Sequence, residues 1–193
     1  MTYLASARAQ FAYYRHLGGQ TLARLSPKQL HAVPHPGGNT VATIVKHLHG
    51  NMRSRWTDFL DADGEKPWRE REAEFEPDDA TQEEVLARWE EGWATVFAAL
   101  DAVEADGDLE RVVYIRAKGH TVTEAINRQL CHYAYHIGQI VLLGRMALGE
   151  DWDSLSIPRG GTAAYNEASS GAGQRREHFT EAVLPKDVPA TER

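Results

Sequence analysis

The amino-acid sequence predicts an all-α protein arranged as a four-helix bundle with long connections and a polar C-terminal tail. Four segments place apolar residues every three or four positions, which is the spacing of one face of an α-helix. Helices of this kind bury their apolar faces against one another, and bundles build their functional sites from side chains on facing helices. We expect the four helices at about residues 3–25, 40–61, 81–103 and 121–148.

The first two helices are marked by apolar faces and by the residues at their ends. Segment 3–25 carries a continuous apolar stripe, and Ser26-Pro27 ends it because the residue before a proline is pushed out of the α region. Asn39 is the expected N-cap of the second helix, since its side chain can accept a hydrogen bond from a free backbone N–H. The second helix then runs over about 40–61.

A long charged connection separates the second helix from the third. It covers residues 62–79 and contains two prolines. Connections of this length are uncommon in compact domains and are often functional. The third helix starts where Thr81 and Glu84 form a capping-box pattern, directly before its apolar stripe.

Residues 107–122 differ in character from the helical segments. The run Val112–Ile115 is β-prone and Lys118-Gly119 is a candidate tight turn, so we expect a short extended piece here. Thr121 and Glu124 then repeat the capping-box pattern and open the fourth helix.

The chain becomes polar and glycine-rich after the fourth helix. We therefore divide it into a helical domain at 1–166 and a polar C-terminal tail at 167–193, with one short helical turn near 175–183. There is no internal repeat and no sign of a second folded domain. A chain of 193 residues is long enough for one domain with a substantial core.

Composition and charge exclude several classes of function. The net charge is −7 and no stripe of Lys and Arg balances it, which argues against nucleic-acid binding. No apolar run reaches the roughly 18 residues needed to cross a membrane, and the N-terminus lacks a signal-peptide pattern. The single cysteine, Cys131, excludes an intrachain disulfide and a cysteine-rich zinc site. Together these features predict a cytoplasmic protein.

His132 and His136 are the strongest candidates for chemistry. They lie four residues apart in the fourth helix, so both side chains project from one face and can bind one ion. We expect this face to point toward the neighbouring helices, where imidazoles need partners for their nitrogen atoms. A metal ion would satisfy both rings, and hydrogen bonds to Tyr, Gln or backbone groups are the alternative.

The second helix offers His47 as a third ligand. His47 lies at the edge of the buried stripe, whereas His49 is expected to face solvent. Three neutral imidazoles with open coordination positions form the ligand set of a catalytic zinc site, and nickel, iron or manganese would also fit. Such an ion lowers the pKa of a bound water or thiol and makes it nucleophilic near neutral pH.

Two amides lie one helical turn from these histidines. Asn51 follows His47 and Gln139 follows His136, so either could orient a ligand or a bound water. An amide at a helix contact is the alternative reading for both. Cys131 neighbours His132, but adjacent helical positions diverge by about 100°. We therefore expect Cys131 to be a small packed residue.

Arg53, Arg55 and Arg116 are candidates for recognising an anionic substrate beside the metal. A salt bridge to one of the many acidic residues is the alternative for each of them. No carboxylate stands out from the sequence as a general base.

The histidine pattern resembles a known family. His47, followed by HYAYHIGQI at 132–140, is similar to the DinB/YfiT-like superfamily of predicted metalloenzymes, and within it to the DUF1572 branch of uncharacterised proteins. The stretches that carry the resemblance are KHLHGNMRSRWTDFL (46–60), DGEKPW (63–68), TVTEAINRQLCHYAYHIGQIV (121–141) and SIPRGGTAAYN (156–166). The similarity covers about residues 5–166.

The resemblance implies a four-helix bundle of DinB/YfiT type with a metal held by His47, His132 and His136, and it implies homodimers. Characterised relatives include thiol-dependent transferases and isomerases that use low-molecular-weight thiols such as bacillithiol or mycothiol. The first hypothesis is therefore an enzyme whose divalent metal activates a thiol or water, for transfer to a small molecule or for its hydrolysis. The alternatives are a non-catalytic dimeric metal-binding bundle with a structural or sensing role, and a metal-free bundle.

Overall fold

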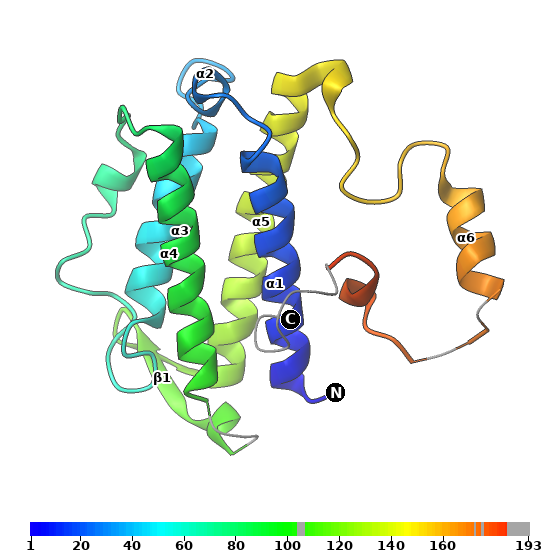
Figure 1. Ribbon diagram of the computed structural model, residues 1–193. Coiled ribbons are helices and arrows are strands. Elements are labelled where there is room, and N and C mark those ends of the chain that lie inside the picture. The colour runs from blue at the N-terminus through cyan, green and yellow to red at the C-terminus, as the bar shows by residue number, and fades with distance from the viewer. Residues whose placement is uncertain (104–106, 172, 175, 185–193) are drawn as a thin grey trace.

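Four long helices lie side by side in the computed structural model, which describes residues 1–103, 107–171, 173–174 and 176–184 (Figure 1). These helices are α1 (Tyr3–Leu22), α3 (Val41–Trp56), α4 (Gln82–Asp101) and α5 (Val122–Leu148). Helix α1 packs against α4 and α5, and α3 packs against the same two helices. The prediction of a mostly helical protein is confirmed.

Shorter elements connect the long helices. They are α2 (Pro27–Leu30), α6 (Thr162–Gly171), strands β1 (Val112–Ile115) and β2 (Lys118–Thr121), and the 3₁₀ turns η1 (Glu72–Phe75), η2 (Asp108–Glu110), η3 (Gly149–Asp151) and η4 (Phe179–Ala182). The two antiparallel strands form a hairpin that pairs Ile115 with Lys118 and Val112 with Thr121. The 3₁₀ turn η4 lies within the segment where we predicted a helical turn.

Local capping accounts for most of the helix starts. Thr81 and Thr121 form capping boxes with Glu84 and Glu124, as predicted. The prediction that Asn39 caps α3 is wrong. Thr40 caps this helix in place of Asn39, because the Thr40 hydroxyl accepts the backbone N–H of Thr43 at 3.1 Å.

Two helices end earlier than their apolar stripes indicate. Helix α1 ends at Leu22, and Ser26 begins the separate helix α2 with its own capping box. Helix α3 ends at Trp56, where we expected it to continue to 61. Thr57 is extended and Asp58 has a positive φ of 49°, and neither backbone conformation continues an α-helix.

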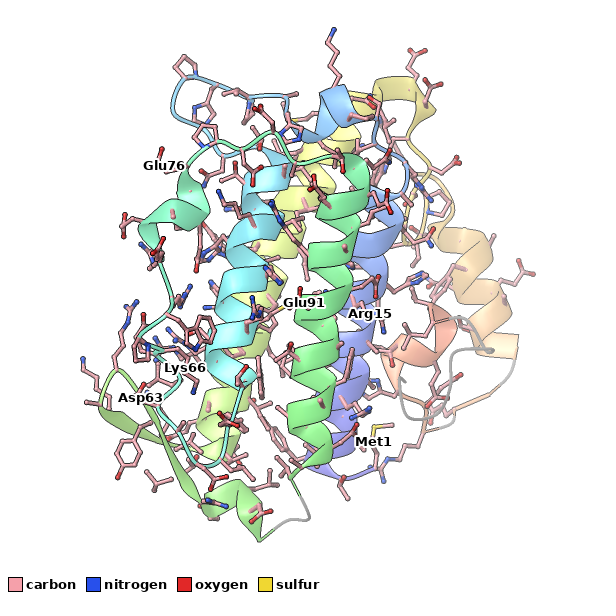
Figure 2. The ribbon with its side chains drawn as sticks, turned by 60° about the vertical axis from the view of Figure 1, so that its left-hand side comes forward. Met1, Arg15, Asp63, Lys66, Glu76 and Glu91 are labelled. Atoms are coloured by element: carbon pink, nitrogen blue, oxygen red, sulfur yellow. The ribbon has the colours of Figure 1, made fainter. Side chains whose placement is uncertain are left out.

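The turn of the β-hairpin is formed by Arg116 and Ala117, and not by Lys118-Gly119 as we predicted. Both turn residues have positive φ angles, 55° and 59°, although neither is glycine. Asp63 compensates, because its carboxylate accepts the backbone N–H of Arg116 at 2.8 Å and of Ala117 at 2.7 Å. Figure 2 shows Asp63 beside the hairpin, so the long connection after α3 fixes the conformation of a turn far along the chain.

An aromatic cluster in the core positions the facing helices. The ring of Phe11 from α1 contacts the rings of Trp56, Trp93 and Tyr133, with centroids 5.8 to 6.2 Å apart. Trp56 donates a hydrogen bond to the hydroxyl of Tyr133 at 2.8 Å, and this hydroxyl donates to Asn51 at 3.2 Å. These contacts therefore join α1, α3, α4 and α5 to one another in the core.

The segment after α5 has few buried residues. Helix α6 has none, and Figure 1 shows it apart from the four long helices. This helix crosses the position at 166–167 where we divided the chain, so the division stays a prediction. Part of the predicted tail, residues 172, 175 and 185–193, lies outside the described residues. Within the part of the chain that is described, no helix has the length and apolar character required to cross a membrane.

Candidate metal centre

Three histidine side chains converge between α3 and α5. Nε2 of His132 lies 3.3 Å from Nε2 of His47 and 3.1 Å from Nε2 of His136. One candidate ligand atom from each of the three residues lies within 4.8 Å of the others. Imidazole nitrogens about 2.0–2.1 Å from a tetrahedral zinc ion are about 3.3 Å apart, so this spacing fits one shared ion. The cluster could hold a metal.

Helix geometry produces the convergence. His132 and His136 are one turn apart on α5, and both lie half-buried at the edge of its core-facing side. We had expected them on the buried stripe itself. His47 on α3 is only 4% exposed and faces them, while the ring of Phe75 in η1 packs against it with centroids 4.7 Å apart.

The Nδ1 atoms of two of these rings contact hydrogen-bond acceptors. His47 donates from Nδ1 to the Glu74 carboxylate at 2.8 Å, and His136 donates from Nδ1 to the Gln139 side-chain oxygen at 3.2 Å. A proton on Nδ1 leaves the lone pair on Nε2 of the same ring. Both tautomers therefore present their free lone pairs to the centre of the cluster, as metal-binding histidines do.

Electrostatics keep the α5 pair neutral. Burial lowers the pKa of His132 to about 3, and the neighbouring His136 and His47 add to this effect. Burial, followed by His47, lowers the pKa of His136 to about 4, against the opposing hydrogen bond to Gln139. At neutral pH both rings are thus uncharged, which is the state that binds a cation.

Hydrogen bonds among the rings do not satisfy the cluster. Nε2 of His132 offers either one proton or one lone pair, yet it contacts two other Nε2 atoms. Nδ1 of His132 is buried and has no hydrogen-bond partner among the residues that the structure describes. One cation would satisfy the three Nε2 lone pairs together, although it would leave Nδ1 of His132 as it is. The residues present fit a divalent metal.

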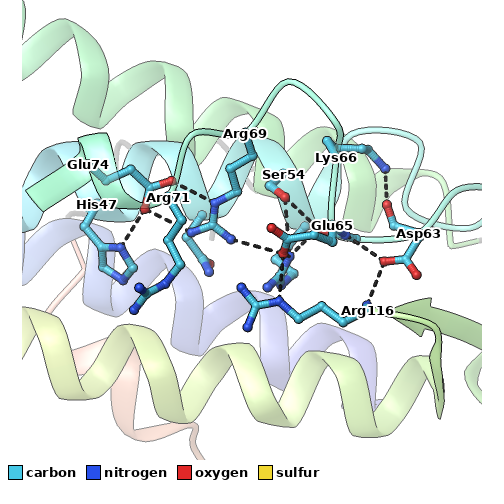
Figure 3. A network of polar contacts seen from close by, with 12 residues as sticks. His47, Ser54, Asp63, Glu65, Lys66, Arg69, Arg71, Glu74 and Arg116 are labelled. Carbon is cyan, nitrogen blue, oxygen red and sulfur yellow. Dashed lines mark hydrogen bonds and ion pairs between the residues drawn. The ribbon is translucent and has the colours of Figure 1, made fainter.

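Glu74 orients His47 and was missed by the sequence analysis. Its carboxylate also accepts from Arg69, Nε at 2.7 Å and a terminal nitrogen at 3.0 Å (Figure 3). Burial alone would raise the pKa of Glu74, but the hydrogen bonds from His47 and Arg69 hold it below its usual range. Gly50 on α3 makes this contact possible, because any side chain at position 50 would collide with the Glu74 carboxylate.

A cavity of about 310 Å³ opens beside the three histidines. Asn51 and Gln129 line it, and the aromatic ring of Phe75 forms part of its wall. The other lining residues are five arginines, namely Arg55, Arg69, Arg71, Arg116 and Arg128. A small molecule in this cavity would lie against the histidines and the guanidinium groups at once.

Two of the three arginines predicted to bind substrate line the cavity, and the third does not. Arg55 is buried and donates to the backbone oxygen of Gly64 and to Glu65, while Arg116 lies at the hairpin turn. Arg53 is directed elsewhere: it pairs with Glu91 at 3.4 Å and lies over the ring of Trp68. It is not among the residues that line the cavity.

Only one of the two predicted amides contacts a histidine of the cluster. Gln139 contacts His136 directly, while Asn51 lines the cavity and contacts Tyr133 instead of His47. Two further expectations were wrong. Cys131 is exposed on α5, and His49 is partly buried beside Glu91 at 3.1 Å.

The residues that the sequence analysis missed lie mainly in the 62–79 connection. Arg69, Arg71 and Glu74 have no periodic pattern that would mark them, and only the length of this charged segment indicated a role. Arg128 had a usable signal. It precedes His132 by four residues, so it lies on the same face of α5 as the histidine pair.

Comparison with known families assigns the chain to a family but gives no activity. Residues 1–161 match the model of a family described as "Protein of unknown function (DUF1572)". No match was found among curated proteins or among solved structures. Because the match covers most of the chain, including all three histidines, the protein belongs to the DUF1572 family.

Proposed function

We propose that the protein is a metal-dependent enzyme of the DinB/YfiT-like superfamily, with the four-helix bundle of that superfamily at residues 1–166 and a polar tail at 167–193. In this proposal His47, His132 and His136 hold one divalent ion through their Nε2 atoms. Zinc or nickel is the expected ion, and iron or manganese would be compatible with three imidazoles. The convergence of the three Nε2 atoms is the observation that carries the proposal.

A divalent ion bound there would act as a Lewis acid that lowers the pKa of a coordinated water or thiol. The protein residues do the positioning. Glu74 and Gln139 fix the orientation of His47 and His136, and Phe75 shields the His47 ring. The reaction we propose is transfer of a low-molecular-weight thiol to a small molecule, or hydrolysis of that molecule.

The adjoining cavity favours catalysis over a purely structural metal site. A structural ion is enclosed by protein ligands, whereas a catalytic ion keeps a position open to solvent or substrate. Here the three histidines line a cavity of about 310 Å³. The superfamily resemblance further leads us to propose a homodimer, which sedimentation or light scattering would test.

Metal analysis of the purified protein tests the site. We expect the wild-type protein, purified without chelator or reconstituted with zinc or nickel, to hold one ion per chain. His132→Ala removes one of three ligands and should lose most of this metal. His35→Ala is the matched control, since His35 lies exposed in the loop before α3 and should leave the metal content unchanged.

Two results would contradict the proposal. One is a wild-type protein that binds neither ion after reconstitution. The other is a His132→Ala variant that keeps the same metal content as His35→Ala.

A further inference from the structure

The cavity beside the three histidines contains an excess of positive charge. Five arginines line it, and none of the described residues that line it is acidic. The positive charges of two of these arginines are balanced by carboxylates: Arg69 pairs with Glu74, and Arg55 pairs with Glu65 at 3.1 Å. Both guanidinium groups are almost fully buried. The Arg55–Glu65 pair joins α3 to the connection, whereas Arg69 and Glu74 both belong to the connection.

The positive charges of the other three arginines are only weakly balanced by acidic groups. Arg71 pairs with Glu72, whose side chain is 91% exposed, and ion pairs of this kind contribute little. Arg116 contacts Glu65 at 3.1 Å, but Glu65 is shared with the buried Arg55. Arg128 contacts the ring of His120 at 3.4 Å, which is not an acidic group.

These three side chains reach the same cavity from three separate elements. Arg71 comes from the connection directly before η1, Arg116 from the hairpin turn, and Arg128 from α5 one turn before His132. Figure 3 shows Arg71 beside His47, with Arg116 extending from the hairpin toward them. Asp63 fixes Arg116 in this position by accepting the backbone N–H groups of the turn.

We propose that Arg71, Arg116 and Arg128 form an anion subsite beside the histidines, and that the substrate is a small organic anion carrying a carboxylate or phosphate group. Guanidinium groups bind both oxyanions through paired N–H donors, and a cleft lined by one sign of charge concentrates the opposite ion. The inference rests on the proposed metal function for the location of the reacting end of the substrate. What the subsite adds is the chemical class of the group at the other end of the substrate.

Anion binding to the full-length protein tests the subsite. Isothermal titration at low ionic strength would use inorganic phosphate and succinate as probes, with the protein as purified and again after metal removal by a chelator. Arg128→Gln and Arg116→Gln should each weaken binding of at least one probe about tenfold, the loss of one charge-assisted contact. Arg145→Gln is the matched control, because Arg145 lies exposed on α5 outside the cavity and its loss changes the net charge equally.

These measurements test the anion subsite and the metal site separately. Binding of a probe by the chelator-treated protein, with the same dependence on Arg128, supports the subsite even where no metal is bound. If His132→Ala keeps its anion affinity and the wild-type protein takes up no metal, only the metal function fails. The probe that binds more tightly identifies the carboxylate or the phosphate as the group recognised.

Equal affinities in the wild type, Arg128→Gln, Arg116→Gln and Arg145→Gln would overturn the subsite. Equal weakening in all three variants would also overturn it, since a general charge effect would then explain the binding. Thermal melting of each variant checks its folding. Arg128 is the decisive position, because it is exposed on α5 and its contact with the His120 ring is long, at 3.4 Å.

Discussion

Glu74 joins the charged connection to the three histidines. Its carboxylate accepts hydrogen bonds from His47 and Arg69, and its position against α3 depends on the absence of a side chain at Gly50. A carboxylate behind a metal-binding histidine fixes the tautomer of the ring and raises its basicity. Glu74 therefore acts on the proposed ion through His47, without touching it.

Replacing Glu74 with Gln should weaken metal binding about 10- to 100-fold, which is the usual effect of changing such a supporting group. The amide can still accept from His47 but lacks the negative charge. Glu72→Gln is the matched control, since Glu72 lies two residues away in η1 and is exposed. Competition with a chromophoric chelator would measure both affinities.

Equal metal affinities for Glu74→Gln and Glu72→Gln would contradict this role. Circular dichroism must accompany the measurement, because Glu74→Gln also leaves the buried Arg69 without its closest charged partner. A folded variant with weakened metal binding is the expected result.

The β-hairpin is the element that departs most from local sequence preference. Its two turn residues occupy left-handed conformations that usually call for Gly or Asn, and the sequence places Arg116 and Ala117 there. Asp63 stabilises this turn from a distance of more than fifty positions along the chain. Turn rules applied to the local sequence therefore favoured Lys118-Gly119, where a glycine is present.

A pair of alanine-to-glycine substitutions tests the conformation of this turn. Ala117→Gly removes the steric cost of a left-handed residue, so it should raise the free energy of unfolding by up to about 1 kcal/mol. Ala94→Gly, at an exposed position inside α4, should lower it by about 1 kcal/mol. Urea denaturation of both variants measures the difference, and destabilisation of equal size in the two would contradict the assigned turn.

Elements whose signals are local were predicted well. Periodic apolar residues located the four long helices, and the capping boxes at Thr81 and Thr121 located two of their starts. The ends of α1 and α3 were misplaced, because Leu25 and Phe59 are buried although they lie beyond the helices. The apolar pattern continues past each helix end because these residues are buried, although the backbone there is no longer helical.

Across the whole molecule, the candidate site depends on both local and distant relationships. The spacing of His132 and His136 predicted one side of it, and His47 was correctly placed opposite them. Arg69, Arg71, Glu74 and Phe75 come from the connection that folds back along α3. This connection is joined to α3 by the contact of Glu65 with Arg55 and of Glu74 with His47. No periodic pattern within 62–79 predicts how this segment folds, so the roles of Glu74 and Arg71 could be identified only from the structure.

In the proposed site, three Nε2 atoms share one cation. Anomalous diffraction across the zinc and nickel absorption edges, from crystals of protein purified without chelator or reconstituted with either ion, tests it most directly. We predict a single anomalous peak about 2.0–2.2 Å from Nε2 of His47, His132 and His136, with at least one further coordination position facing the cavity. Reconstituted crystals with no anomalous peak among these three rings, or with an ion bound by other residues, would contradict it.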